Sequence, residues 1–318
     1  MRRTGTSAFF ALVCALVLGC GECARAEQSQ ALQSEAPQSE APSSDGSAAS
    51  SGVALQSQDL SVPMIDAHGS AVRLKARVCR PAGDAPATLV LINHGSPPNA
   101  SDRPKMQLGR CDQEATQWFL ARGYVVGFVL RRGYGETGGA WAESQDGCDN
   151  PNFVAAGLET ARDIDAAVNY LTALPFVRHD AAVVVGQSAG GWGSIAYDSV
   201  PHPKVAAFVV MAGGRGGHRY NQPNHNCRPD LLAEAAGRFG TRASTPMLWI
   251  YTANDSYFAP PIARALWQAF TAAGGKAQLE QPGPYGEDGH RLFFGPKGSE
   301  VWGPLVEPYL ASRGIAAN

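Results

Sequence analysis

One nine-residue segment constrains the fold of this chain more than any other. Residues 183–191 read Val-Val-Val-Gly-Gln-Ser-Ala-Gly-Gly, so a short apolar run enters a Gly-x-Ser-x-Gly motif. In such a motif the serine sits on a strained strand-to-helix turn, where side chains at the flanking positions would collide with neighbouring backbone. The turn places the Ser188 hydroxyl at the edge of the sheet. There it also faces the N-terminus of a helix, whose dipole stabilises developing negative charge. The segment predicts a nucleophilic serine, with a purely structural tight turn as the alternative.

The rest of the chain alternates short apolar runs with helical patterns, which predicts a mostly parallel sheet with crossover helices. Residues 72–78 alternate apolar and polar side chains, as a partly exposed edge strand would. Buried strands are expected at 87–92, 124–130, 182–185, 205–211 and 247–251. Helices are expected at 114–122, 153–174, 192–197, 261–273 and 302–312.

A serine hydroxyl is a weak nucleophile at neutral pH, so a base must take its proton and an acid must orient that base. In a strand–turn–helix fold of this kind the partners follow the serine in the order Asp or Glu, then His. Asp255 comes directly after the apolar run 247–251, and His290 lies 35 residues later in Gly-Glu-Asp-Gly-His. We therefore expect Asp255 to be the acid and His290 the base.

Each partner has an alternative. Asp288 is the local rival for the acid, but it lies two residues before His290 on the same loop and does not leave a strand end. Asp255 could instead cap the helix near Pro261, and His290 could be an ordinary surface histidine.

Two backbone amides are expected to stabilise the negative charge that develops on the substrate oxygen. One is the amide of Ala189. The other comes from the loop Asn-His-Gly-Ser-Pro-Pro at 93–98, where the prolines have no N–H, so the donor is Gly95 or, as we favour, Ser96. We interpret His94 as a structural residue that braces this loop.

These motifs resemble the dienelactone hydrolase and prolyl-oligopeptidase-like branch of the α/β-hydrolases. The residues that carry the resemblance span most of 70–295 and are His94-Gly95, 131–135, 163–175, 186–191, Asp255 and His290. The resemblance implies an α/β-hydrolase fold, in which helices flank a mostly parallel central sheet, and a Ser-His-Asp hydrolase of esters or peptide bonds. Dienelactone hydrolases use a cysteine where this chain has Ser188, so their substrate is not carried over. The large N-terminal propeller of the oligopeptidases is also not expected, because a spacer precedes residue 59.

Several residues are expected around the serine. An insertion at about 213–242 is predicted to form a lid, and the loop 133–152 approaches it from the next strand. Aromatic side chains that could line a substrate pocket, or pack in the core instead, are Tyr134, Trp141, Trp192 and Tyr220.

The sequence shows no pattern typical of a metal or cofactor site. His218, His225 and Cys227 lack the spacing of metal ligands, and the sequence has no dinucleotide-binding or phosphate-loop motif. We expect neither a metal nor an organic cofactor.

The N-terminal residues predict export. Arg2 and Arg3 precede an apolar run at 8–19, as in a signal peptide. Ala-Arg-Ala at 24–26 suits cleavage by signal peptidase after Ala26. Val-Leu-Gly-Cys at 17–20 resembles a lipoprotein processing site instead, at which Cys20 would be lipidated. The run is shorter than the ~20 residues that span a bilayer, so no transmembrane span is expected. Residues 27–58 carry a tandem Gln-Ser-Glu-Ala-Pro repeat and predict a flexible spacer, followed by one domain at 59–318.

Charge and cysteine content narrow the function further. The chain has 26 basic and 28 acidic residues, and removal of residues 1–26 leaves a net charge of −4, which argues against nucleic-acid binding. Four cysteines remain and allow three pairings; from loop placement we expect Cys148–Cys227, which would clamp two loops over the pocket, with Cys79–Cys111 as the second pair.

The sequence therefore predicts a periplasmic or secreted serine hydrolase, or a membrane-anchored lipoprotein, that cleaves small-molecule carboxylic esters through an acyl-enzyme. A serine exopeptidase with the same triad is one alternative. A catalytically silent envelope binding protein is another, since one fold hosts many functions.

Overall fold

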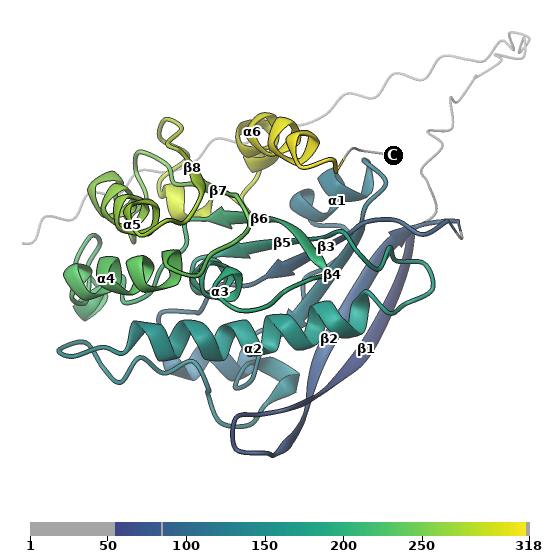
Figure 1. Ribbon diagram of the computed structural model, residues 1–318, viewed down its shortest axis with the longest axis horizontal. Helices are drawn as coiled ribbons and strands as arrows, with labels where there is room; N and C mark the ends of the chain where they lie inside the picture. The colour runs from purple at the N-terminus through teal and green to yellow at the C-terminus, as the bar shows by residue number, and fades with distance from the viewer. Residues whose placement is uncertain (1–54, 84, 316–318) are drawn as a thin grey trace, which may run out of the picture. The chain divides into compact units, whose positions relative to one another are not determined.

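The computed structural model describes residues 55–83 and 85–315, which build one eight-stranded sheet flanked by helices (Figure 1). The strands lie in the order β1-β2-β4-β3-β5-β6-β7-β8; β1, β2 and β4 pair antiparallel, and all other neighbours pair parallel. The bounds are β1 Leu55–Ile65, β2 Ala71–Pro81, β3 Leu89–Asn93, β4 Val125–Leu130, β5 Ala182–Gln187, β6 Val205–Met211, β7 Met247–Ile250 and β8 Ala277–Glu280.

Helices cover both faces of the sheet. α1 and α6 share one hydrophobic cluster with one face, and α2 to α5 share a second cluster with the other face. Figure 1 shows α1 and α6 together above the sheet, with α2 running along its opposite side. The bounds are α1 Glu114–Leu120, α2 Phe153–Leu171, α3 Ala189–Asp198, α4 Pro229–Gly240, α5 Pro260–Ala272 and α6 Gly298–Ser312.

The apolar strands are buried on both sides, which explains why their sequences do not alternate. In β5, Val183 and Val185 belong to the cluster with α1 and α6, whereas Val184 packs in the cluster with α2 and α3. A strand with helices on both faces has no solvent side to keep polar. The predicted α/β architecture is confirmed.

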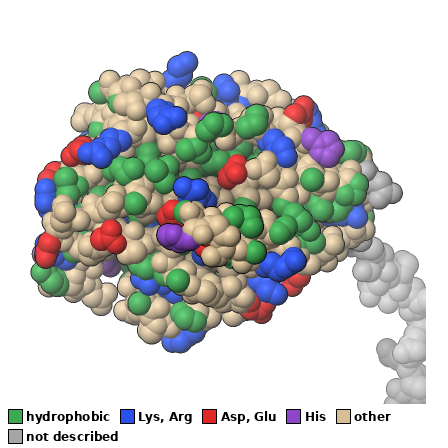
Figure 2. All heavy atoms as spheres, turned by 60° about the horizontal axis from the view of Figure 1, so that its bottom comes forward, with side chains coloured by type: hydrophobic (Ala, Val, Ile, Leu, Met, Phe, Trp, Pro, Cys, Tyr) green, Lys and Arg blue, Asp and Glu red, His purple; other side chains and the backbone are tan. Residues whose placement is uncertain are grey.

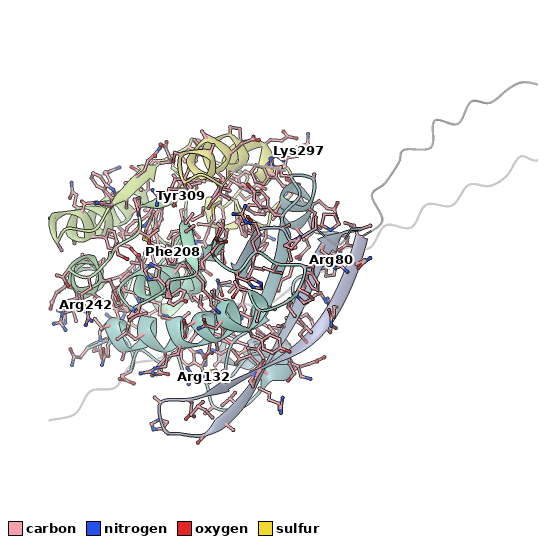
Figure 3. The ribbon with its side chains drawn as sticks, turned by 45° about the vertical axis from the view of Figure 1, so that its right-hand side comes forward. Arg80, Arg132, Phe208, Arg242, Lys297 and Tyr309 are labelled. Atoms are coloured by element: carbon pink, nitrogen blue, oxygen red, sulfur yellow. A yellow bond between two sulfur atoms is a disulfide. The ribbon has the colours of Figure 1, made fainter. Side chains whose placement is uncertain are left out.

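α6 is fastened to the sheet by a polar contact as well as by packing. The Tyr309 hydroxyl accepts a hydrogen bond from the Phe208 amide of β6 (3.2 Å) and donates one to the Pro246 carbonyl (2.7 Å). Figure 3 shows Tyr309 and Phe208 close together between α6 and the sheet. The buried Tyr309 hydroxyl is therefore satisfied both as a hydrogen-bond donor and as an acceptor.

Two strands, β1 and β8, lie outside the sequence-based expectations, and they form the two edges of the sheet. β2 was expected as an edge strand, but β1 pairs along its whole length, from Leu55 opposite Pro81 to Ile65 opposite Ala71. In β1 only Val62 is buried, and Leu60 and Met64, two residues to either side, pack partly buried against the same hydrophobic cluster. β8 is four residues long and only half-buried, and it forms the opposite edge.

The first described strand begins inside the range that was expected to be a spacer. β1 starts at Leu55, whereas the spacer was placed at 27–58. The expected signal segment 1–26 and Cys20 lie outside the described residues. Within 55–83 and 85–315, no helix combines the length and apolarity needed to cross a membrane.

The expected lid at 213–242 divides into two parts. Its second part is α4, whose buried face, including Leu232 and Phe239, packs in the core with α2 and α5. The first part, before α4, borders the cavity described below through residues 214–220 and Cys227. The signal for α4 was available in Pro229 at its first turn and in the spacing of its apolar residues.

Two disulfides join the expected cysteines. Cys79 of β2 is bonded to Cys111 in the segment before α1, and Cys148 is bonded to Cys227 across a sequence separation of 79 residues. The pairing expected from loop placement is confirmed.

Loss of the Cys79–Cys111 disulfide should destabilise the domain because the bond closes a loop across 32 residues. In the Cys79→Ser/Cys111→Ser variant we expect the free energy of unfolding, measured by urea titration, to fall by about 2–4 kcal/mol. A variant that unfolds at the same urea concentration as the wild type would contradict the pairing.

Candidate active site

Three segments that follow strands at the carboxyl edge of the sheet bring Ser188, Asp255 and His290 into one region. Ser188 follows β5, Asp255 follows β7, and His290 lies in the 3-10 helix η4 (Gly289–Arg291) beyond β8. All three are buried, with 8%, 1% and 8% of their surface exposed, respectively. In open parallel sheets this edge is where ligands bind.

Ser188 adopts φ 54° and ψ −118°, a conformation that costs a non-glycine residue free energy. The motif glycines permit it by close backbone approach. A Cβ at Gly190 would lie 2.6 Å from the His94 carbonyl oxygen, and one at Gly191 would lie 2.8 Å from the Gly213 Cα. Neighbouring backbone therefore fills the space on the helix side of the turn.

The His290 imidazole faces the Asp255 carboxylate. Its Nδ1 lies 3.1 Å from Oδ1 and 3.2 Å from Oδ2 of Asp255. Asp255 Oδ1 also accepts hydrogen bonds from the amides of Tyr257 and Phe258, both at 2.8 Å. These amides belong to the loop before α5, whose own N-cap is Ala259, so Asp255 does not cap that helix.

With Nδ1 directed at Asp255, Nε2 is the nitrogen left to act on a proton. The hydrogen bonds of His290 within the described residues are those to Asp255 and two made by its backbone, to Asp288 and Gln187. The Ser188 hydroxyl is therefore not bonded to His290 in this structure. Such contacts commonly form only when substrate binds.

Gln187 connects the serine turn to the histidine loop. Its Nε2 donates to the His290 carbonyl oxygen (3.2 Å). A Cβ at Gly95 would lie 3.0 Å from the Ser188 Cβ and would also collide with the Gln187 side chain. The sequence analysis missed Gln187, although its place inside the Gly-x-Ser-x-Gly motif was visible.

Asp288 holds the histidine loop without touching the imidazole. Its Oδ1 accepts from the amides of Ser256 and His290, both at 3.0 Å, and its Oδ2 accepts from the Ser256 hydroxyl (2.7 Å). Burial raises the pKa of Asp288, but these hydrogen bonds outweigh it and the pKa is lowered. The rival acid is thus a brace between the loops after β7 and β8.

Tyr257 packs against the same imidazole. Its ring centroid lies 4.2 Å from that of His290 and 3.5 Å from that of His218, so the tyrosine is stacked between two histidines. His218 Nε2 lies 2.9 Å from the Ser256 hydroxyl. No sequence motif indicated this stack, because its three members come from three separate loops, after β6, β7 and β8.

The loop after β3 approaches Ser188 from the other side. Ser96 and Ala189 border the same cavity as Ser188, whereas Gly95 packs beneath them against Gln187. Ala189 is the first residue of α3, where backbone N–H groups have no partner within the helix. Of the two residues considered for the second amide donor, Ser96 therefore has the more open position.

His94 braces this loop, as its place in the sequence predicted. Burial, followed by the charge of Arg131, lowers the pKa of His94 to about 3, so the ring is neutral. Its Nδ1–H donates to the Gly95 carbonyl (2.6 Å), and its Nε2 accepts from the Arg131 amide (3.3 Å). Both ring nitrogens are occupied.

A buried ionic cluster lies behind the loop. Glu143 is fully buried and pairs with both Arg131 and Arg215. Burial raises the pKa of Glu143, but the two arginines lower it to about 2. The Tyr134 hydroxyl donates to Glu143 (3.0 Å) and lies 3.0 Å from the Ser96 hydroxyl, which connects the cluster to the cavity wall.

Arg132, the next residue along, forms a second buried pair. Its Nε lies 2.6 Å from Asp163 Oδ1 and its amide donates to Asp163 Oδ2 (2.7 Å), while its Nη2 donates to Glu159 (2.8 Å). Figure 3 shows Arg132 beside α2. These contacts fix the Arg-Arg-Gly-Tyr-Gly turn at 131–135 against α2.

A cavity of about 560 Å³ adjoins Ser188. Of the four aromatic residues considered for its wall, Trp141 and Tyr220 border it. Trp192 is a core residue instead: it is fully buried, and its Nε1 donates to the Phe153 carbonyl (2.9 Å). Tyr134 is also fully buried and accepts a hydrogen bond from Trp141 Nε1 (2.9 Å), so it supports the wall from behind.

The Cys148–Cys227 disulfide also borders the cavity. It joins the loop before α2 to the segment before α4, as expected of a clamp between the two loops. Because Cys227 is bonded to Cys148 and His218 contacts Ser256, these side chains are engaged with protein partners rather than gathered as metal ligands.

Comparison with known proteins agrees with this geometry. The model of the prolyl oligopeptidase family matches residues 111–210. No curated protein matches the chain.

Solved structures with the same fold include hydrolases of two kinds. A Klebsiella pneumoniae protein assigned as a dienelactone hydrolase is 14% identical over 81% of this chain and 99% of its own, with a TM-score of 0.56. The Pyrococcus horikoshii acylaminoacyl peptidase is 15% identical over 81% of this chain, with a TM-score of 0.57, and this chain covers 41% of it. A Pyrococcus furiosus esterase is 15% identical over 80% of this chain and 92% of its own, with a TM-score of 0.53.

These neighbours establish the α/β-hydrolase fold. Together with the family match, they confirm the resemblance to the dienelactone hydrolase and prolyl-oligopeptidase-like branch. The family match over residues 111–210 agrees with a hydrolase.

Removal of the Glu143 charge should destabilise the domain because it leaves Arg131 and Arg215 buried without a counter-charge. We expect Glu143→Gln to lower the free energy of unfolding by about 3–5 kcal/mol at pH 7. The exposed Glu136→Gln on the same loop is the matched control and should change it by less than about 0.5 kcal/mol.

The effect should also depend on pH. A carboxylate whose pKa is lowered to about 2 stabilises the folded state above its unfolded pKa of about 4.3, and this contribution is lost as the pH falls towards 2. The difference between wild type and Glu143→Gln should therefore be constant from pH 5 to 7 and shrink below pH 4.5. A difference that stays constant down to pH 2 would contradict the ionised pair.

Proposed function

We propose that this protein is an exported serine hydrolase that cleaves carboxylic esters through Ser188, His290 and Asp255. The observation that carries the proposal is the pairing of His290 Nδ1 with Asp255 at 3.1 Å, on a loop that Gln187 joins to the strained serine turn. Ser188 of that turn borders the cavity of about 560 Å³. Family match and fold agree with a hydrolase.

The first half of the reaction forms an acyl-enzyme. Ser188 Oγ attacks the ester carbonyl carbon and passes its proton to His290 Nε2, while the Asp255 carboxylate stabilises the imidazolium that results. The amides of Ala189 and Ser96 donate to the oxyanion of the tetrahedral intermediate, an interaction worth about 2.7–4 kcal/mol per donor in other hydrolases. Collapse breaks the bond to the alcohol, which leaves with the proton from His290.

The second half returns the enzyme to its starting state. Water attacks the acyl carbon and gives its proton to His290 Nε2, and a second oxyanion forms at the same amides. Its collapse releases the carboxylic acid and restores the Ser188 hydroxyl. The stacked Tyr257 keeps the imidazole plane fixed through both halves.

A serine exopeptidase with the same triad is the second candidate, and the acylaminoacyl peptidase neighbour speaks for it, since a peptide with an acylated amino terminus carries no free amine. A peptide with a free amino terminus would need a carboxylate anchor. The carboxylate side chain on the cavity wall is Asp149, which is 91% exposed and already pairs with Arg219. The charge of the wall favours esters over substrates with a free amine. A silent binding protein would keep the fold without turnover.

Export is part of the proposal. Two disulfides persist in an oxidising compartment such as a bacterial periplasm and are rare in the cytosol. Cleavage after Ala26 and lipidation of Cys20 remain the two proposed routes, and the mass of the N-terminal peptide of the processed protein distinguishes them.

Replacement of the nucleophile should abolish turnover while the fold is retained. We expect Ser188→Ala to lower kcat for 4-nitrophenyl acetate by about 10⁶-fold, because the triad acts as a unit. Circular dichroism should be unchanged. Turnover within tenfold of the wild type would exclude Ser188 as the nucleophile.

Replacement of Asp255 should lower kcat far more than replacement of Asp288. Asp255→Asn should lower kcat by about 10⁴-fold because the histidine loses its orienting charge. Asp288→Asn removes a brace and leaves the Asp255 contact in place, so we expect a loss of about tenfold or less. Equal losses in the two variants would show that Asp255 is not the specific partner of the base.

A further inference from the structure

His218 is connected to the base of the proposed triad through a stack of aromatic rings. Its ring centroid lies 3.5 Å from that of Tyr257, and the two ring planes are inclined by only 9°. Tyr257 stacks in turn on His290, with centroids 4.2 Å apart and planes inclined by 25°. Stacked aromatic side chains restrict each other's orientation because their contact is lost when one ring tilts. The plane of the His290 imidazole therefore depends on Tyr257, and the plane of Tyr257 depends on His218.

A chain of hydrogen bonds joins the same two histidines. His218 Nε2 lies 2.9 Å from the Ser256 hydroxyl and 3.0 Å from the Ser256 carbonyl oxygen. The hydroxyl donates to Asp288 Oδ2 (2.7 Å), and Asp288 Oδ1 accepts from the His290 amide (3.0 Å). Because the carbonyl oxygen can only accept, Nε2 of His218 carries a proton. This second connection ends on the backbone of His290, whereas the stack ends on its ring.

The backbone at His218 is held in a strained conformation. Its φ of 56° and ψ of 46° lie in the left-handed region, which a residue other than glycine keeps only where its surroundings over-determine it. The segment that follows is bonded to the two residues that connect the histidines. The Asn224 amide donates to the Ser256 carbonyl (2.7 Å), and Asn226 Nδ2 donates to the Tyr257 carbonyl (2.6 Å). His218 is therefore fixed from both its side chain and its own loop.

This arrangement is particular to His218 and does not follow from its place on the loop. The chain has seven histidines, and Figure 2 shows histidine side chains lying apart from one another on the face that it presents. His225 lies on the same loop and is exposed. Among the described residues, its hydrogen bonds are made by its backbone, to Arg219 and Gln222. His225 thus provides a matched position without the contacts of His218.

We infer that His218 is a positioning residue for His290, whose imidazole plane it holds through Tyr257. In the proposed reaction the imidazole takes a proton from the serine and gives it to the leaving alcohol, and then repeats both transfers with water. Each transfer requires the same ring orientation, so a ring that is free to tilt lowers the rate of both halves. His218 itself exchanges no proton with the substrate. The inference rests on the proposed triad hydrolysis.

Replacement of His218 by asparagine removes the ring but suits the backbone, because asparagine also adopts left-handed conformations. We expect His218→Asn to lower kcat for 4-nitrophenyl acetate by about tenfold and to leave KM within about twofold of the wild-type value. His225→Asn makes the same change at the exposed position of the same loop and should leave kcat unchanged. A loss below threefold in His218→Asn, or an equal loss in His225→Asn, would overturn the inference.

His218 also borders the cavity, so direct contact with the substrate is the rival explanation. Positioning of the base predicts the same loss of kcat for 4-nitrophenyl acetate and 4-nitrophenyl butyrate, because His290 serves every ester alike. A loss in His218→Asn that differs more than fivefold between the two esters would assign the residue to substrate binding and overturn the inference.

Two further variants test the route through Tyr257. His218→Phe keeps a ring on the tyrosine and loses the N–H, so kcat should return to within about threefold of the wild type in a protein whose circular dichroism is unchanged. If His218 acts through Tyr257, the two losses are not additive, and His218→Asn should lower kcat less than about twofold further in Tyr257→Leu. A further tenfold loss in Tyr257→Leu/His218→Asn, or no recovery in folded His218→Phe, would contradict the route.

A measurement without turnover separates this inference from the proposed function. The proton on His290 Nδ1, which faces Asp255, is observed by NMR of protein with ¹⁵N-labelled histidine and is assigned by its loss in His290→Ala. We expect its resonance to broaden or vanish in His218→Asn and to persist in His225→Asn. If no ester is hydrolysed, this result would still support the positioning role although the proposed function failed. A resonance that is unchanged in His218→Asn would overturn the inference.

Discussion

The backbone at Ser188 can keep its φ of 54° because neighbouring chain fills the space where side chains at Gly190 and Gly191 would stand. The turn is set by β5 below it, by α3 after it and by the loop after β3 beside it. β5 is buried on both faces of the sheet, and every residue of α3 is buried as well. The position of the hydroxyl is thus a consequence of how the whole sheet packs, since strain of this kind persists only when the surroundings over-determine it.

The central part of the fold could be predicted from the sequence because its strands are buried on both faces. Strands of this kind are continuous apolar runs, and β3 to β7 all have that property. β1 and β8 could not be found in this way, because β1 buries only Val62 and β8 buries none of its four residues. Pairing along an edge depends on backbone hydrogen bonds, which side-chain patterns do not encode.

In the candidate site, too, local sequence patterns indicate some residues and not others. Ser188, Asp255 and His290 could be proposed because each follows a strand or motif in a fixed order along the chain. The groups that support them come from separate loops. Asp288 was considered as a rival acid, yet the structure shows it bracing the loop that carries His290. The partners of Glu143 lie 12 and 72 residues away, beyond the reach of any local pattern.

The central claim is that Ser188 is a nucleophile activated by its surroundings rather than a serine in a tight turn. The most direct measurement is labelling of the processed, disulfide-bonded protein with a fluorophosphonate, followed by peptide mass spectrometry. An activated serine forms a phosphonyl ester that an ordinary hydroxyl does not. The account predicts one adduct per chain on the peptide that contains Ser188, lost when His290 is replaced by alanine. A folded protein that remains unlabelled, or one labelled at another serine, would contradict it.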